Sequence, residues 1–131
     1  MNNRLIQAAR DVQGFFPLSG GEYDAGRVGA ALLTVSGNIY TGICIDLACG
    51  IGFCAEHAAA AEMLKAHETE VRAMVAVGFD GTIWPPCGRC RELIYQLNPK
   101  NADTQVILAP DRAVPLRDLL PEYWNTGTKN T

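Results

Sequence analysis

Apolar residues recur about once per helical turn in four parts of the chain. Residues 3–13 and 53–67 both show this spacing, and the second stretch is rich in alanine, the residue that favours helices most. A third helix is predicted after Pro85-Pro86, because the missing N–H of a proline needs no partner at a helix start; it ends at Asn98-Pro99. Residues 115–120 can form a short last helix.

Short apolar runs between these helices predict strands. Residues 28–35 and 39–45 flank the turn Ser36-Gly37-Asn38 and predict a β-hairpin. Residues 71–79 are typical of a buried strand, and residues 104–109 predict another. Residues 14–26 contain glycine, proline, serine and aspartate with little periodicity, which predicts a loop.

The resulting order is helix, hairpin, helix, strand, helix, strand and helix. This order is typical of an α/β fold in which helices cover a mixed sheet. The 131 residues are enough for one domain and too few for a second independent core. We therefore predict a single domain over residues 1–124, followed by a polar C-terminal tail over residues 125–131.

Composition and charge exclude several classes of protein. Apolar residues make up 48% of the chain and charged residues 19%, which favours a packed core over disorder. No apolar run approaches the roughly 20 residues that span a bilayer, and the N-terminus does not resemble a signal peptide, so we expect a cytoplasmic protein. Eleven Lys and Arg against 14 Asp and Glu leave no basic block for phosphates, which makes nucleic acid a poor candidate substrate.

Three of the five cysteines stand at predicted helix starts. An odd number of cysteines without an export signal disfavours a disulfide framework. Cys54 opens one helix, whereas Cys87 and Cys90 open the next at a spacing that turns both sulfurs toward one point. The positive ends of the helix dipoles favour thiolates, and three thiolates select Zn²⁺. Three protein ligands leave the fourth position open, as in catalytic zinc sites.

Glu56 follows Cys54 by two residues and is well placed to reach water at such a metal. We therefore predict that Glu56 is the proton shuttle. A redox dithiol would also account for the two cysteines of the third helix, but it does not explain Cys54 and Glu56 on a separate helix. A structural zinc module that binds a partner is a further alternative, and it requires a fourth ligand from His57, Cys49 or Cys44.

These two half-motifs together carry a resemblance to a known family. Cys54-Ala55-Glu56, followed about thirty residues later by Pro86-Cys87-Gly88-Arg89-Cys90, resembles the zinc-dependent cytidine deaminase superfamily. The resemblance extends over residues 5–124, and the run from Cys87 to Arg91 looks most like the blasticidin-S deaminases. It implies a three-layer α/β/α sandwich with a mixed five-stranded sheet and a homo-oligomer, with a tetramer favoured.

The resemblance also implies a reaction. A free cytosine nucleoside, either cytidine, deoxycytidine or an antibiotic such as blasticidin S, would be hydrolysed at C4 to the uracil analogue and ammonia. Glu56 would carry the water proton to N3 of the ring. The Ala55 backbone would contact the pyrimidine edge, and the Pro85 carbonyl would lie near the departing amine. Deamination of another amino-heterocycle stays an alternative, as does the choice between pyrimidine salvage and detoxification.

Some positions depart from the family pattern. Where ordinary cytidine deaminases hold the ribose with Asn and Glu, this chain has Cys44 and Asp46. Asp46 can accept a hydrogen bond from a hydroxyl group or can be a turn residue, whereas Cys44 is a weak donor. Three thiolates also make the zinc site negative, and Arg89 or Arg91 could offset that charge or be surface residues.

Overall fold

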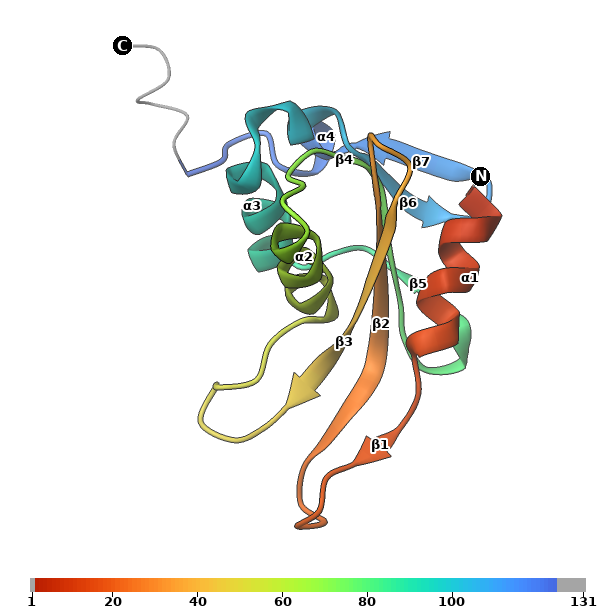
Figure 1. The fold of residues 1–131 in the computed structure, drawn as a ribbon, viewed down its shortest axis with the longest axis vertical. Helices are drawn as coiled ribbons and strands as arrows, with labels where there is room; N and C mark the ends of the chain where they lie inside the picture. The colour runs from red at the N-terminus through yellow and green to blue at the C-terminus, as the bar shows by residue number, and fades with distance from the viewer. Residues whose placement is uncertain (1, 125–131) are drawn as a thin grey trace.

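The four predicted helices are present in the computed structural model, which describes residues 2–124 (Figure 1). The tail predicted for residues 125–131 lies outside the described part. The helices are α1 (Asn2–Val12), α2 (Ala55–Lys65), α3 (Gly88–Leu97) and α4 (Leu116–Leu119), with short 3₁₀ turns at Phe79–Gly81 and Pro99–Asp103. Within residues 2–124, no helix is both long and apolar enough to cross a membrane.

The sheet is mixed, and its strands outnumber those predicted. It contains β1 (Phe16–Pro17), β2 (Asp24–Thr34), β3 (Ile39–Asp46), β4 (Val71–Val77), β5 (Ile83–Trp84), β6 (Gln105–Ala109) and β7 (Arg112–Pro115). The long strands lie in the order β3-β2-β4-β6-β7, while β1 extends beside β2 and β5 beside β4. Only the β4–β6 pair is parallel among the described strands.

The expected count of five strands is therefore corrected to seven, of which five are longer than two residues. The two extra strands, β1 and β5, are only two residues long, so they show no alternation that a sequence pattern could reveal. The predicted loop over residues 14–26 is also partly wrong, because β2 begins at Asp24 and pairs with the end of β3.

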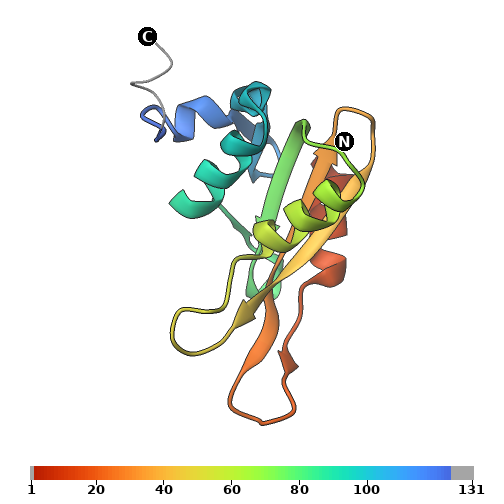
Figure 2. The same cartoon turned by 60° about the vertical axis from the view of Figure 1, so that its left-hand side comes forward.

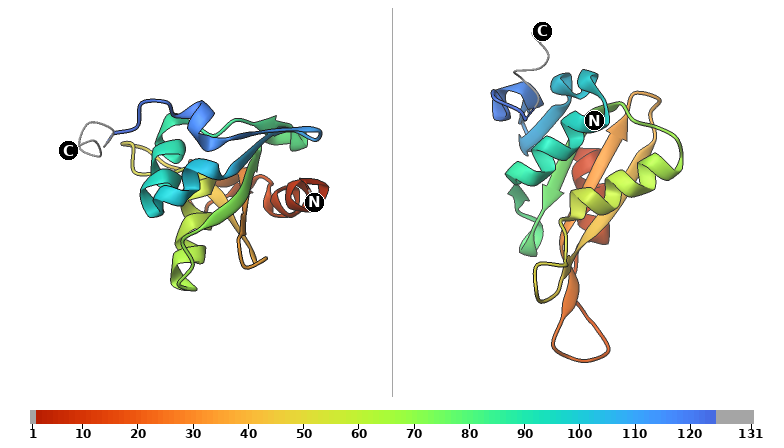
Figure 3. Two further views of the ribbon diagram at one scale, coloured as in Figure 1. Left: turned by 90° about the horizontal axis from the view of Figure 1, so that it is seen from above. Right: turned by 90° about the vertical axis from the view of Figure 1, so that its left-hand side faces the viewer.

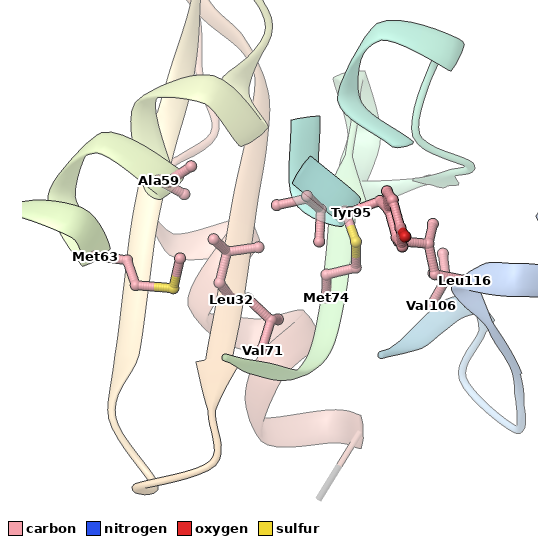
Figure 4. Packing of buried hydrophobic residues seen from close by; sticks show 10 residues of the cluster. Leu32, Ala59, Met63, Val71, Met74, Tyr95, Val106 and Leu116 are labelled. Carbon is pink, nitrogen blue, oxygen red and sulfur yellow. The ribbon is translucent and has the colours of Figure 1, made fainter. Parts of the chain in front are cut away.

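Helices cover both faces of the sheet, as the three-layer prediction requires (Figures 2 and 3). Side chains alternate between the faces along β2, so Ala31 and Leu33 pack with α1 while Leu32 packs with Met63 of α2 and Ile94 of α3. Figure 4 shows this second core between the sheet and the helices. The predicted α/β/α sandwich is confirmed.

Gly42 allows the N-terminal half of α2 to lie directly against β3. A Cβ atom at this position would overlap the backbone of Ala59 and Ala55. Only glycine permits so close an approach of two backbones. The consequence is that the first turn of α2, which carries Cys54 and Glu56, is held against the end of the sheet.

Glu68 ties the β2–β3 turn to the loop after α2. Its carboxylate accepts hydrogen bonds from the hydroxyls of Ser36 and Tyr40, both at 2.6 Å, and from the Asn38 amide at 2.8 Å. These donors stabilise the ionised carboxylate and lower the pKa of Glu68 to about 2. The carboxylate is therefore more acidic in the folded chain than in the unfolded chain.

We expect Glu68→Gln to lower the melting temperature at neutral pH, with a smaller loss in acid. A lowered folded pKa contributes stability above the unfolded value of about 4.5, and this contribution is lost as the pH falls toward about 2. Thermal unfolding between pH 3 and pH 7 should thus show a gap between parent and variant that narrows on acidification. Glu22→Gln, in the exposed β1–β2 turn, is the control; a Glu68→Gln gap independent of pH would contradict the assignment.

Candidate metal and catalytic site

The N-termini of α2 and α3 meet at one end of the sheet, and each begins at a cysteine. Cys54 and Cys87 are the N-cap residues, both with extended backbone. Neither thiol makes a side-chain cap hydrogen bond to its own helix. Both sulfurs thus remain available for another partner, at the positive ends of two helix dipoles.

A small backbone bridge fixes where α2 starts. Ile45 and Phe53 exchange two hydrogen bonds, at 3.0 and 3.1 Å, between the end of β3 and the residue before Cys54. The bridge closes the loop over residues 46–52 into a compact turn. Asp46, at the end of β3, is thereby brought to the same cavity as the first turn of α2.

The three predicted ligand sulfurs lie close together. Cys54 Sγ is 3.5 Å from Cys87 Sγ, and Cys87 Sγ is 3.6 Å from Cys90 Sγ. The third pair, Cys54 and Cys90, lies within 4.8 Å. Zinc–sulfur bonds of about 2.3 Å at tetrahedral angles place two sulfurs about 3.8 Å apart, so the donor set fits Zn²⁺.

His57 reaches the same cluster. Its Nδ1 lies 3.6 Å from Cys90 Sγ, and it forms a group of possible metal donors with Cys54 and Cys90. The ring also stacks on Phe53, with centroids 6.3 Å apart. Burial lowers the pKa of His57, and the positive charge of Arg89 lowers it further, which favours the neutral imidazole. The sequence offers His57 only as a possible fourth ligand of a structural zinc, and its Nδ1 does lie close enough to the Cys54 and Cys90 sulfurs to share a metal with them.

The thiols differ in acidity. Burial raises the pKa of the Cys54 thiol and of the fully buried Cys90 thiol, and the charge of Glu56 adds to the rise at Cys90. Burial also opposes ionisation of Cys87, but N–H groups at the start of α3 and the neighbouring thiols lower its pKa overall. The predicted effect of the helix ends therefore prevails only at Cys87. The other two thiols need a cation nearby before they ionise.

Glu56 is buried beside these sulfurs, with only 4% of its surface exposed. It lies in the first turn of α2 and lines a cavity of about 480 Å³. Burial raises the pKa of Glu56, since the ionised form loses its hydration. A buried carboxyl group of raised pKa beside a metal-binding cluster is suited to carrying protons near neutral pH.

The cavity brings together most of the predicted site residues from distant parts of the chain. Besides Glu56, those that line it are Cys44, Asp46, Cys54, Ala55, Pro85 and Cys87. Arg89, considered above as a compensating charge, also lines it. The other lining residues were not indicated by the sequence patterns; they are Val28, Leu47, Gly50, Gly52, Phe53, Ala76 and Trp84. Cys90 lies behind the wall, fully buried. The volume is sufficient for a small organic ligand.

Trp84 supplies an aromatic wall that the sequence patterns did not indicate. It stands on the two-residue strand β5 and is 55% exposed. Its indole lies over Gly78, where any Cβ atom would overlap the ring. Hydrophobic periodicity does not indicate such a contact. Only the presence of a glycine six residues before a tryptophan could have suggested it.

A cluster of charged side chains lies where β2 begins and β3 ends. Asp24 and Asp46 are directly opposite each other in the strand pair. Arg27 donates two hydrogen bonds to Asp24, at 2.7 and 3.2 Å, and these lower the pKa of Asp24. The Cys44 thiol, which accepts from the Val28 N–H at 3.3 Å, lies 3.6 Å from Asp46 Oδ2. The carboxylate of Asp46 thus faces the cavity as an exposed acceptor.

The two arginines proposed to offset the thiolates differ in position. Arg89 lines the cavity and its charge acts on His57, as expected of a residue beside the cluster. Arg91 instead donates hydrogen bonds to the backbone carbonyls of Pro86 and Leu119. Its guanidinium keeps its charge but is directed to the backbone, whereas Arg89 lies at the cavity itself.

Comparison with known proteins places this site in a family. Residues 6–105 match the family described as the cytidine and deoxycytidylate deaminase zinc-binding region. A cytidine deaminase of Halalkalibacterium halodurans is 37% identical over 87 residues, covering 66% of this chain and 64% of the relative. A cytidine deaminase of Mycobacterium tuberculosis is 31% identical over 101 residues, covering 76% of this chain and 74% of the relative. The match to the first of these spans slightly less than two thirds of its length.

Solved structures show the same fold. The crystal structure of a cytidine deaminase from Burkholderia pseudomallei superposes with a TM-score of 0.75 at 28% identity, over 95% of this chain and 99% of that chain. The crystal structure of cytidine deaminase from Mycobacterium tuberculosis gives a TM-score of 0.72 at 26% identity, over 95% and 94% of the two chains. The architecture is shared along nearly the whole of each chain.

Proposed function

Because this chain belongs to the cytidine and deoxycytidylate deaminase family with its zinc-binding region, we propose that it is a zinc-dependent aminohydrolase acting on a free cytosine nucleoside. The observation that carries the proposal is the burial of Glu56 in the cavity beside the sulfurs of Cys54 and Cys87. The products would be the uracil analogue and ammonia.

The proposed zinc ligands are Cys54, Cys87 and Cys90. Their sulfurs have the mutual distances that a tetrahedral zinc site requires, and they arrive from two helix ends held against the sheet. Zinc bound there would supply a Lewis acid that lowers the pKa of a bound water molecule to near neutral pH. The exposed Arg89 guanidinium at the cavity would offset part of the negative charge of the thiolates.

Glu56 is the proposed proton carrier. Its carboxylate would take a proton from water and deliver it to N3 of the cytosine ring while oxygen adds at C4. It would then move the proton of the new C4 hydroxyl group to the amino group, so that the C4=O bond forms, the C4–N bond breaks and ammonia leaves. The Ala55 backbone and the Pro85 carbonyl, which both line the cavity, would hold the ring edge and the departing amine.

The carboxylate of Asp46 favours a nucleoside over a nucleotide whose phosphate would lie beside it. Arg27 is engaged by Asp24, whereas Asp46 presents its carboxylate to the cavity. Such a carboxylate can accept a hydrogen bond from a hydroxyl or ammonium group, and it repels a phosphate. The Cys44 thiol beside it is a weak hydrogen-bond donor and acts mainly as a small apolar wall of the cavity. We therefore propose that Asp46 contacts the substituent on the ring, with Cys44 behind it.

The direct test is ultraviolet absorbance of the zinc-loaded protein with cytidine, deoxycytidine, cytosine, blasticidin S and deoxycytidylate in separate reactions. Ammonia release is measured in parallel. Turnover of cytidine or deoxycytidine supports a salvage enzyme, and turnover of blasticidin S alone supports detoxification. Absence of turnover with all five, in protein that binds zinc stoichiometrically, would contradict the proposal. A cytoplasmic location and a homotetramer stay predictions, the second to be checked by sedimentation velocity.

A non-catalytic zinc module is the second candidate, and one observation favours it. His57 stands near enough to the cluster to supply a fourth ligand, which would close the coordination sphere. That candidate leaves the buried carboxyl group of Glu56 and the cavity in front of it without a purpose. The enzymatic proposal accounts for both.

We expect Asp46→Asn to raise KM for cytidine with little change in kcat. A hydrogen bond to a charged group contributes about 1.5–3 kcal/mol, so kcat/KM should fall about 10- to 150-fold. The variant should also discriminate less against deoxycytidylate, because one repulsive charge is removed. Asp111→Asn, an exposed carboxylate outside the cavity, is the matched control. An unchanged KM would make Asp46 a turn residue without contact to the substrate.

A further inference from the structure

Arg91 contacts the backbone on both sides of a proposed zinc ligand. It lies one residue after Cys90 and is half-buried. Its Nε–H donates to the carbonyl of Pro86 at 2.7 Å, and its backbone N–H donates to the carbonyl of Cys87 at 3.0 Å. The second bond is the ordinary one of the first helical turn, so the bond to Pro86 is the contribution of the Arg91 side chain.

The segment before α3 has few backbone donors that could fix its conformation. Pro85 and Pro86 have no N–H groups, so neither can donate a backbone hydrogen bond. Pro86 is buried, and a buried carbonyl needs a partner. Arg91 supplies that partner with a charged donor, which makes a stronger hydrogen bond than a neutral one.

The same guanidinium reaches a distant part of the chain. Arg91 Nη1 donates to the carbonyl of Leu119, the last residue of α4, at 3.0 Å. The residues after α4 are docked on the next positions of α3: Glu92 accepts from the Trp124 N–H at 2.6 Å, and the rings of Tyr95 and Tyr123 lie 4.0 Å apart. The C-terminal segment is thus attached along the helix that begins at the zinc ligands.

We propose that Arg91 is a positioning residue for the zinc site, which ties the Pro86 carbonyl beside Cys87 to the Leu119 carbonyl at the end of α4. The planar guanidinium bonds both carbonyls at once and so sets where the Cys87 sulfur stands relative to Cys90. The inference rests on the proposed assignment of Cys87 and Cys90 as ligands. It links the end of α4 to the proposed zinc ligands through one side chain.

The test is zinc affinity, measured on the full chain by competition with a chelator and without substrate. Residues that orient metal ligands typically contribute about 10- to 100-fold to affinity, so Arg91→Met should bind zinc about tenfold or more weakly. Arg91→Lys should fall between the parent and Arg91→Met, since an ammonium group is a single point of donation. Arg72→Met is the matched control: it also removes an arginine bond to a carbonyl, that of Val35 at 3.2 Å, outside the cavity.

Thermal unfolding of the metal-free proteins separates positioning from general support. A lower melting temperature of Arg91→Met with the zinc affinity of the parent would overturn the inference, because Arg91 would then only brace the fold. If Arg91→Met does not fold, Arg91→Lys decides, and an affinity equal to that of the parent overturns it. A parent that binds zinc without deaminating any substrate would contradict the proposed function and leave this result interpretable.

Discussion

Glu56→Gln should bind zinc as the parent does and lose nearly all deaminase activity. General acid–base catalysis by a positioned side chain contributes about 10²- to 10⁴-fold, so kcat for cytidine should fall by at least 10². Both proton transfers of the proposed reaction pass through this one carboxylate, which places the expected loss at the upper end of that range. The measurement is steady-state kinetics by ultraviolet absorbance, with zinc content determined on the same samples.

The substitution is nearly isosteric, so a loss of activity would not reflect a loss of folded protein. Glutamine removes a charge that burial disfavours, so the melting temperature should not fall. Glu62→Gln makes the same change on an exposed face of α2, where the carboxylate pairs only with Lys65 at 3.4 Å. It should retain parental kcat. If Glu56→Gln keeps parental kcat as well, the buried carboxyl group is structural and the proposed mechanism is wrong.

The sequence was sufficient to predict the helices, and with them the positions of the candidate site residues along the helices. Cys54 and Glu56 share the first turn of α2, while Cys87 and Cys90 share that of α3, and those spacings follow directly from helix geometry. The approach of the two helix ends is a tertiary contact, which the sequence suggested only through its resemblance to a family. The sulfur distances agree with that suggestion.

Features that depend on loops and edges could not be predicted. Trp84 enters the cavity because a two-residue strand pairs with β4 over Gly78, and neither leaves a periodic signal. From the sequence, Arg91 could be a surface residue or a compensating charge. Its bond to Leu119 could not be foreseen, because the two residues are 28 positions apart. His57 was one of three possible fourth ligands of a structural zinc, and its distance to Cys90 depends on how the two helices pack. The Arg91 and His57 contacts join residues far apart in the chain, whereas the Trp84 contact is local but belongs to a strand too short to show a pattern.

Removing the proposed ligand Cys87 should have a large effect on metal binding, and His57 is the informative comparison. The three-sulfur site requires Cys87→Ala to lose far more zinc affinity than His57→Gln. If His57 only contacts the Cys90 sulfur from outside, its loss should lower affinity by at most about 10- to 100-fold. Chelator competition on both variants, with Cys49→Ala as an exposed control thiol, measures the difference.

The order of the two effects decides between the candidate functions. A large loss for Cys87→Ala with a modest loss for His57→Gln leaves three ligands and an open position, as a hydrolytic site requires. Equal and severe losses would mean that Cys54, His57, Cys87 and Cys90 close the sphere around the metal, which favours the non-catalytic module. A severe loss of zinc affinity for His57→Gln alone would mean that His57, and not Cys87, is the third ligand. Because the imidazole is neutral, that site would carry one negative charge less, and Arg89 would no longer be needed to offset it.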